Sequence, residues 1–103
     1  MSLSERQKKH LRGLAHPLHP IVSVGGKSDG EEKLEAITKE LDGALHAHEL
    51  VKVSVRVGDR EIRDGMFDDL VKRTSSEFVQ RIGKIGVLYR ARKDKPKIIL
   101  PDA

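Results

Sequence analysis

The sequence predicts an α/β (α+β) fold: one compact domain over residues 1–103, with elements in the order α-β-α-β-α-β-β around a mixed four-stranded sheet. Segments with helical apolar spacing alternate with short β-branched runs, an order that favours some parallel strand pairing. A tight glycine turn joins the last two strands, which indicates an antiparallel hairpin. There is no composition break, and a chain of this size can bury roughly two thirds of its unfolded surface in one core.

A helix from Ser4 to about Ala15 is the first predicted element. Ser4 and Gln7 match a capping box, in which each side chain satisfies a free backbone N–H group at the helix start. The residues on its apolar side are Leu11, Leu14 and Ala15. The segment "HPLHP" then excludes helix, because proline pushes the residue before it into an extended conformation. The residues that follow, 21–24 ("IVSV"), are predicted to form a short buried strand.

The second helix begins with Ser28 or Asp29 as its N-cap and Glu31 or Glu32 as the matching acidic residue. Its apolar stripe consists of Leu34, Ile37, Leu41, Ala44 and Leu45. In "LVKVSVRV" (residues 50–57) valine then alternates with polar residues, which predicts a strand with one buried face.

After a break at residues 58–59, a third helix is predicted from about Arg60 to Thr74. Its apolar stripe consists of Ile62, Met66, Phe67, Leu70 and Val71. The segments "EFVQRI" and "VLYRA" are predicted to be strands joined by the turn "GKIG", residues 83–86. The tail "KIILP" is expected to add apolar cover or a strand edge.

The composition limits the possible functions. The chain has no cysteine, which excludes disulfides, thiolate metal sites and cysteine catalysis and is typical of a reducing compartment. The N-terminal residues contain no apolar signal-peptide core, and no run approaches the ~20 apolar residues that a membrane span needs. We therefore expect a soluble cytoplasmic protein that does not enter a membrane.

The charges are distributed unevenly along the chain. Residues 1–27 have a net charge of +4, residues 28–80 of −5 and residues 81–103 of +5. If the fold brings the two basic ends together, they form a positive surface that attracts polyanions by counterion release. The alternative is a set of solvated charges that only keeps the protein soluble.

The loop in "PIVSVGGKSDGEEKL" (residues 20–34) contains "GKS", as phosphate-binding loops do. A Walker A motif requires glycine five positions before "GK", and Ile21 occupies that position, which excludes this motif. Gly25 and Gly26 have no Cβ, so a phosphate could approach the free N–H groups of the helix start, with Lys27 adding a charge. The alternative is an ordinary helix cap, because acidic residues of the first turn already supply anions there.

Three separated blocks resemble one known family: "LRGLAHPLHPIVSVG" (11–25), "ALHAHELVKVSV" (44–55) and "IGKIGVLYR" (82–90). In this order and at these separations they resemble the YhbY-like, or CRM domain, family, from about Leu3 to Pro101. The resemblance implies a small RNA-binding domain with a fold similar to the C-terminal domain of bacterial translation initiation factor 3. Stand-alone bacterial members are associated with precursors of the large ribosomal subunit, which implies ribosomal RNA as partner and a function in ribosome assembly.

The resemblance also implies a G-x-x-G loop, which KH domains use to clamp a nucleic-acid backbone. Gly25 is its first glycine, Gly26 and Lys27 are the variable pair, and Ser28 replaces the second glycine. Serine adopts a positive φ angle only at a cost, so the loop geometry is expected to differ from the family pattern. Serine keeps its N–H group and adds a hydroxyl that can bond a phosphate.

Basic residues from both ends of the chain are expected to extend this binding surface. If the first helix and the last hairpin border the loop, they add the following cations: Arg6, Lys9, Arg12, Lys27, Lys84 and Arg90. An aromatic stacking platform is not expected, because Phe67 and Phe78 fit apolar core patterns. Tyr89 is assigned to core or sheet packing, with base stacking as the alternative.

Neither an enzyme nor a metal site is predicted. The chain has five histidines: His10, His16, His19, His46 and His48. None has an acidic or sulfur partner at a recognisable ligand spacing, and no serine has a nucleophile-elbow context. We expect a monomeric, non-catalytic RNA-binding protein without cofactor, metal or small-molecule substrate. The alternative is an adaptor that docks on ribosomal or assembly proteins through the acidic second and third helices.

Overall fold

The computed structural model describes residues 3–25 and 31–102, and within them it confirms the predicted order of elements. These elements are α1 (Glu5–Ala15), β1 (Val22–Val24), α2 (Glu31–His48), β2 (Leu50–Val55), α3 (Arg60–Thr74), β3 (Glu77–Ile82) and β4 (Ile85–Tyr89). The strands form a four-stranded mixed sheet in the order β1-β2-β4-β3. β1 pairs with β2 in parallel, and the other two pairs are antiparallel.

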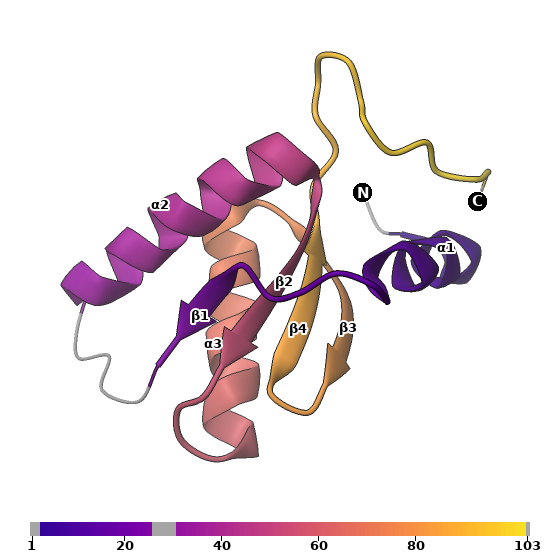
Figure 1. The fold of residues 1–103 in the computed structure, drawn as a ribbon. Helices are drawn as coiled ribbons and strands as arrows, with labels where there is room; N and C mark the ends of the chain where they lie inside the picture. Colours follow the sequence, from indigo (N-terminus) through magenta and orange to yellow (C-terminus); the bar gives the residue numbers. More distant parts are fainter. Residues whose placement is uncertain (1–2, 26–30, 103) are drawn as a thin grey trace.

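The sheet is covered on both faces, as Figure 1 shows. α2 and α3 pack on one face, where the core contains Val22, Val24, Leu41, Leu45, Val51, Val53, Val55, Phe67, Leu70 and Leu88. α1 and the C-terminal segment pack on the other face, over Leu50, Val79, Val87 and Tyr89. Side chains of β4 alternate between the two cores because successive residues of a strand point to opposite faces. The C-terminal segment thus adds apolar cover through Ile98 and Leu100.

The start of α1 has the predicted capping box. The Gln7 amide donates to Ser4 Oγ over 3.1 Å, and the Ser4 amide donates to Gln7 Oε1 over 3.0 Å. Leu11 and Ala15, one turn apart, are buried against the sheet. The expectation that Leu14 is also buried is wrong: its side chain is 41% exposed. It lies beside the Leu11–Ala15 stripe, beyond the part of α1 that touches the sheet.

Two more apolar residues are exposed where the sequence predicts burial. Ile21 is 51% exposed, because only Val22 and Val24 of this edge strand point toward α2 and the alternate residues lie on the opposite face. Ile62 is 54% exposed. It covers the backbone of Gly58 instead of the sheet: a Cβ built on Gly58 would lie 2.8 Å from Ile62 atoms.

The final hairpin turns more tightly than predicted. Ile82 pairs with Ile85, so the turn consists of Gly83, whose φ is +60°, and Lys84. Gly86 therefore belongs to β4 and not to the turn. A Cβ built on Gly86 would lie 2.6 Å from Cε1 of Phe67, so this glycine allows the ring of α3 to lie directly on the strand.

Glu49 joins the C-terminal segment to the rest of the fold. It follows the end of α2 with a φ of +65° and is fully buried. Its carboxylate accepts hydrogen bonds from the backbone amides of Arg92 (2.7 Å), Lys97 (2.7 Å) and Ile98 (2.6 Å). Burial alone raises the pKa of this carboxyl, but the three amides and the charge of Arg92 outweigh it. The pKa of Glu49 therefore lies below its ordinary value of 4.5.

We expect Glu49→Gln to lower the free energy of unfolding by about 2 kcal/mol near neutral pH, because it replaces charge-assisted hydrogen bonds with weaker ones. A lowered pKa stabilises the fold above the unfolded-state value of 4.5. This contribution disappears as the pH falls through the folded-state pKa. Urea titrations measure the free energy of unfolding of the variant and of wild type. The difference between them should be large at about pH 7 and small at about pH 3. A difference that is constant with pH, or an equal loss in the exposed α2 control Glu35→Gln, would contradict this function of Glu49.

Candidate nucleic-acid interface

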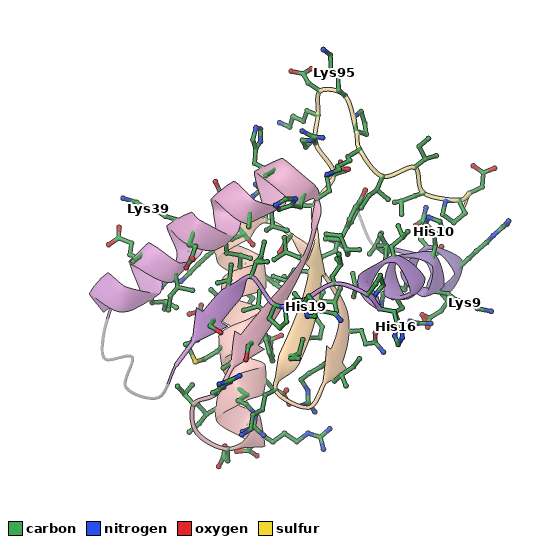
Figure 2. The ribbon with its side chains drawn as sticks, viewed as in Figure 1. Lys9, His10, His16, His19, Lys39 and Lys95 are labelled. Atoms are coloured by element: carbon green, nitrogen blue, oxygen red, sulfur yellow. The ribbon has the colours of Figure 1, made fainter. Side chains whose placement is uncertain are left out.

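The outward side of α1 carries three cations. Arg6 and Lys9 are exposed and Arg12 is half-buried, each three residues after the last. Because Leu11 and Ala15 fix the opposite side of the helix to the sheet, these side chains point away from the core or along its margin. Figure 2 shows Lys9 extending from α1, whereas Lys39 lies on α2 and Lys95 at the tip of the C-terminal segment.

A hollow of about 510 Å³ lies between α1 and the neighbouring face of the sheet. We call it the basic hollow; it is lined by Lys9, Arg12, Gly13, Ala15, His16, Lys52, Gln80 and Ile82. Three lysine or arginine side chains and one histidine thus surround one concave site. None of the described residues that line it is acidic. An anion in this hollow would face several nitrogen donors and no competing carboxylate.

Lys52 is held in place by the chain that leaves α1. Its Nζ donates to the carbonyl oxygens of Leu18 (3.0 Å) and His16 (3.4 Å). An ammonium group has three N–H donors, so one remains for a ligand. Lys52 is not among the residues that the sequence predicts to bind RNA. The alternation of β2 places it on the polar face of the strand, but only the packing of α1 turns that face into the wall of a hollow.

A second hollow, of about 560 Å³, lies on the outer side of α1. We call it the outer hollow; it is lined by Arg6, Lys9, His10, Gly13, Leu14 and Pro101. Lys9 and Gly13 line both hollows. The two hollows therefore adjoin each other at α1, and Lys9 can contact a ligand in either of them.

The glycine of the candidate loop and the hairpin lysine lie at the same end of the sheet. Gly25 follows β1 and is exposed. The amide of Arg56 donates to the carbonyl of Val24 (2.9 Å), and the amide of Val55 donates to that of Lys84 (2.8 Å). The turn with Lys84 directly follows Ile82, which lines the basic hollow. The other predicted loop residues lie outside the described residues: Gly26, Lys27 and Ser28.

Arg90 lies apart from these cations, at the opposite end of β4 from the turn. Its Nη1 donates to Asp42 Oδ1 (2.6 Å) and to the carbonyl of Thr74 (2.7 Å). Its Nη2 donates to the carbonyl of Asp42 (3.1 Å). These contacts join α2 to the end of α3 and to the end of β4, and the Asp42 carboxylate balances the guanidinium charge. They give Arg90 a structural function, and we leave it out of the candidate interface.

The aromatic residues are internal. The rings of Phe67 and Phe78 contact each other with centroids 5.6 Å apart. Tyr89 is buried in the core beneath α1, which excludes base stacking on an exposed ring. Burial raises its pKa, and the nearby Glu49 carboxylate raises it further.

The five histidines are distributed over α1, the segment after it and the end of α2. Among residues 3–25 and 31–102, no three histidine or acidic side chains form a group that could hold a metal ion. Within the same part of the chain, no helix has the length and apolar character required to cross a membrane.

These features define a small α/β domain with one hollowed, cationic side, a form suited to polyanionic ligands. The family model of the CRS1/YhbY (CRM) domain matches residues 3–90. The chain belongs to the CRS1/YhbY (CRM) domain family, as the three sequence blocks predicted.

Relatives from distant bacteria match nearly the full length of the chain. A protein of Haemophilus influenzae named "RNA-binding protein" is 42% identical over 97% of this chain and 96% of its own length. The "Probable RNA-binding protein YqeI" of Bacillus subtilis is 38% identical over 96% of this chain and 99% of its own. The solution structure of a hypothetical protein from Staphylococcus aureus, to which RNA binding has been ascribed, superposes with a TM-score of 0.77 at 36% identity. It covers 96% of this chain and 99% of that one.

Proposed function

We propose that this protein binds RNA without catalysis, through one continuous surface that we call the basic face. The basic face consists of the basic hollow, the outer hollow and the sheet end with Gly25 and Lys84. The loop residues Gly26, Lys27 and Ser28 belong to this proposal as the continuation of Gly25. The names of the relatives support RNA as the ligand.

The observation that carries the proposal is the basic hollow. The fold places Lys9 and Arg12 of α1 beside Lys52 of β2, so that residues far apart in sequence line one concave site. Phosphodiester groups are the anions that recur at regular intervals along RNA, so neighbouring phosphates can occupy the two hollows around α1 together. α2 has a net negative charge, with five acidic residues against two lysines, whereas the charges of α3 balance; both helices cover the other face of the sheet. This distribution repels RNA from that face and orients it toward α1.

The contacts available on the basic face favour recognition of the RNA backbone. The described cations are lysines and arginines suited to phosphates, and no described aromatic ring is exposed to stack on successive bases. Such a surface binds structured RNA by shape and charge, with little dependence on sequence.

We further propose that the ligand is ribosomal RNA in precursors of the large ribosomal subunit, bound in the cytoplasm by a monomer during assembly. The resemblance to stand-alone bacterial CRM proteins, which are associated with such precursors, supports this choice of RNA. The test is crosslinking in cells followed by sequencing of the attached RNA, with ribosomal particles separated by sedimentation. We expect large-subunit ribosomal RNA to be enriched in precursor fractions. Crosslinks to messenger or transfer RNA alone would contradict the assignment.

A further inference from the structure

A third hollow, of about 420 Å³, opens beside the C-terminal end of α1 and differs in chemistry from the other two. We call it the apolar hollow; its lining is Leu14, Leu18, His19, Ile21, His48, Leu50, Val51, Lys52, Lys97 and Ile98. Leu14, Leu18 and Ile21 are 41%, 39% and 51% exposed, so large aliphatic groups face solvent together at one place. A concave, mostly apolar site with a few polar groups at its margin is the usual form of a small-ligand site.

The walls of the apolar hollow are fixed by contacts elsewhere in the fold. The Glu49 carboxylate holds the backbone amides of Lys97 and Ile98, which form one wall. Lys52 Nζ holds the carbonyl of Leu18 on another side. The hollow is therefore preformed, which lowers the ordering cost of binding.

The apolar hollow adjoins both cationic hollows. Lys52 lines it together with the basic hollow, and Leu14 lines it together with the outer hollow. An RNA strand whose phosphates lie along α1 thus passes the mouth of an apolar site. The part of a nucleotide that suits such a site is its base, which has two apolar faces and a polar edge.

The margin of the apolar hollow selects among bases. Lys52 and Lys97 are donors only, His19 and His48 can each donate or accept, and none of the described lining residues is acidic. Uracil has two carbonyl oxygens, and guanine has O6 and N7 as acceptors. Adenine and cytosine carry an exocyclic amino donor where guanine and uracil carry a carbonyl oxygen, so they offer the two lysines fewer acceptors.

We propose that the apolar hollow receives one unstacked uracil or guanine base of the RNA strand that the basic face binds. This inference rests on the proposed function and adds one site of base recognition to it. Continuity with the cationic hollows on two sides favours an RNA base over a protein segment. A protein segment that filled the hollow would compete with RNA for Lys52.

The proposal is tested by NMR titration of the protein with guanosine 5′-monophosphate, uridine 5′-monophosphate and ribose 5-phosphate. Both nucleotides should shift the methyl signals of Leu14, Leu18 and Ile21 and the amide signals of Lys9 and Arg12. Ribose 5-phosphate, which has no base, should shift only the α1 amides. The methyl signal of Ile62, which is similarly exposed on α3, should not respond to any of the three.

The titration separates failure of this proposal from failure of RNA binding itself. If the α1 amides respond to all three compounds and the methyl signals to none, the base site is refuted and the basic face survives. If no compound moves the α1 amides, the proposed function fails as well. Methyl shifts with an acidic amphipathic peptide but not with nucleotides would overturn the proposal in favour of a protein partner. Methyl shifts on raising the protein concentration alone would overturn it in favour of a second copy of the chain.

Variants give an independent readout on a longer ligand. Leu18→Gln combined with Ile21→Gln should weaken binding of a uridine heptanucleotide by about tenfold, because one base loses its apolar contact. The slope of affinity against salt should not change, because no phosphate contact is removed. Ile62→Gln should leave the affinity as it is, and thermal unfolding checks that all variants are folded. Equal affinities of the double variant and wild type would refute the base site.

Discussion

Reversing the charges of Lys9 and Arg12 together is expected to weaken RNA binding by about 100-fold, the largest effect on function that the structure predicts. Both residues line the basic hollow, and Lys9 lines the outer hollow as well. Two charge-assisted contacts at about 1.5 kcal/mol each account for a loss of about 3 kcal/mol, which corresponds to about 100-fold in affinity. Lys9→Glu with Arg12→Glu can be measured by anisotropy on a labelled fragment of large-subunit ribosomal RNA.

The matched control changes the same net charge on the other side of the molecule. Lys39→Glu with Lys72→Glu alters exposed lysines of α2 and α3, and Lys39 lies well away from α1 in Figure 2. If net charge alone controlled binding, both double variants would lose the same affinity. We expect the RNA affinity of the control to fall only a few-fold, because its long-range attraction to RNA is weaker. Equal losses would exclude a localised basic face.

Gly86→Ala is expected to lower the free energy of unfolding by about 3 kcal/mol, because the new methyl group would overlap the ring of Phe67. The closest approach would be 2.6 Å, and both residues are buried, so the ring or the strand must shift. Either the ring leaves its position against Phe78 or β4 separates from α3. Urea unfolding monitored by circular dichroism measures the loss.

Gly43→Ala is the matched control for this substitution. Gly43 lies on an exposed part of α2, with no atom near a Cβ built there. Alanine should stabilise the helix by up to about 1 kcal/mol, because it favours helix more than glycine does. Opposite signs for the two glycines would show that close packing on Phe67 determines the result at Gly86. A neutral effect of Gly86→Ala would contradict this contact.

Features that depend on residues close together in the sequence were predictable. The capping box of Ser4 and Gln7 and the helix bounds Arg60 and Thr74 agree with the structure, since each depends on neighbouring residues. Burial of individual residues was less predictable, because it depends on which part of an element another layer covers. Leu14 is helical as expected but lies beside the contact between α1 and the sheet, where it forms the apolar hollow.

The differences between the expected and the observed surroundings of these residues have a common physical cause. "GKIG" has the composition of a turn, but Gly86 pairs with Val53 and Arg81 within the sheet, where its lack of a Cβ leaves room for Phe67. The charge of Arg90 suggested an RNA contact, but the fold places Asp42 and the Thr74 carbonyl beside it. Lys52 was overlooked because a lysine on the polar side of a strand is common, and the hollow that contains it forms only when α1 docks. Sequence patterns indicate which residues are cationic, and tertiary packing decides which of them meet.

The most direct test of the basic face is the salt dependence of RNA affinity. For about five phosphate contacts, the slope of log K against log salt should be near −3.5 for single strands or −4.5 for a duplex, by analogy with DNA. Lys9→Glu with Arg12→Glu should make the slope shallower by about 1.4 to 1.8, because two contacts are lost. A wild-type slope near zero, or the same slope in this double variant, would contradict phosphate binding at the basic face. A slope near zero would favour the alternative of a protein-binding adaptor, and an unchanged slope in the variant would place the phosphate contacts elsewhere on the chain.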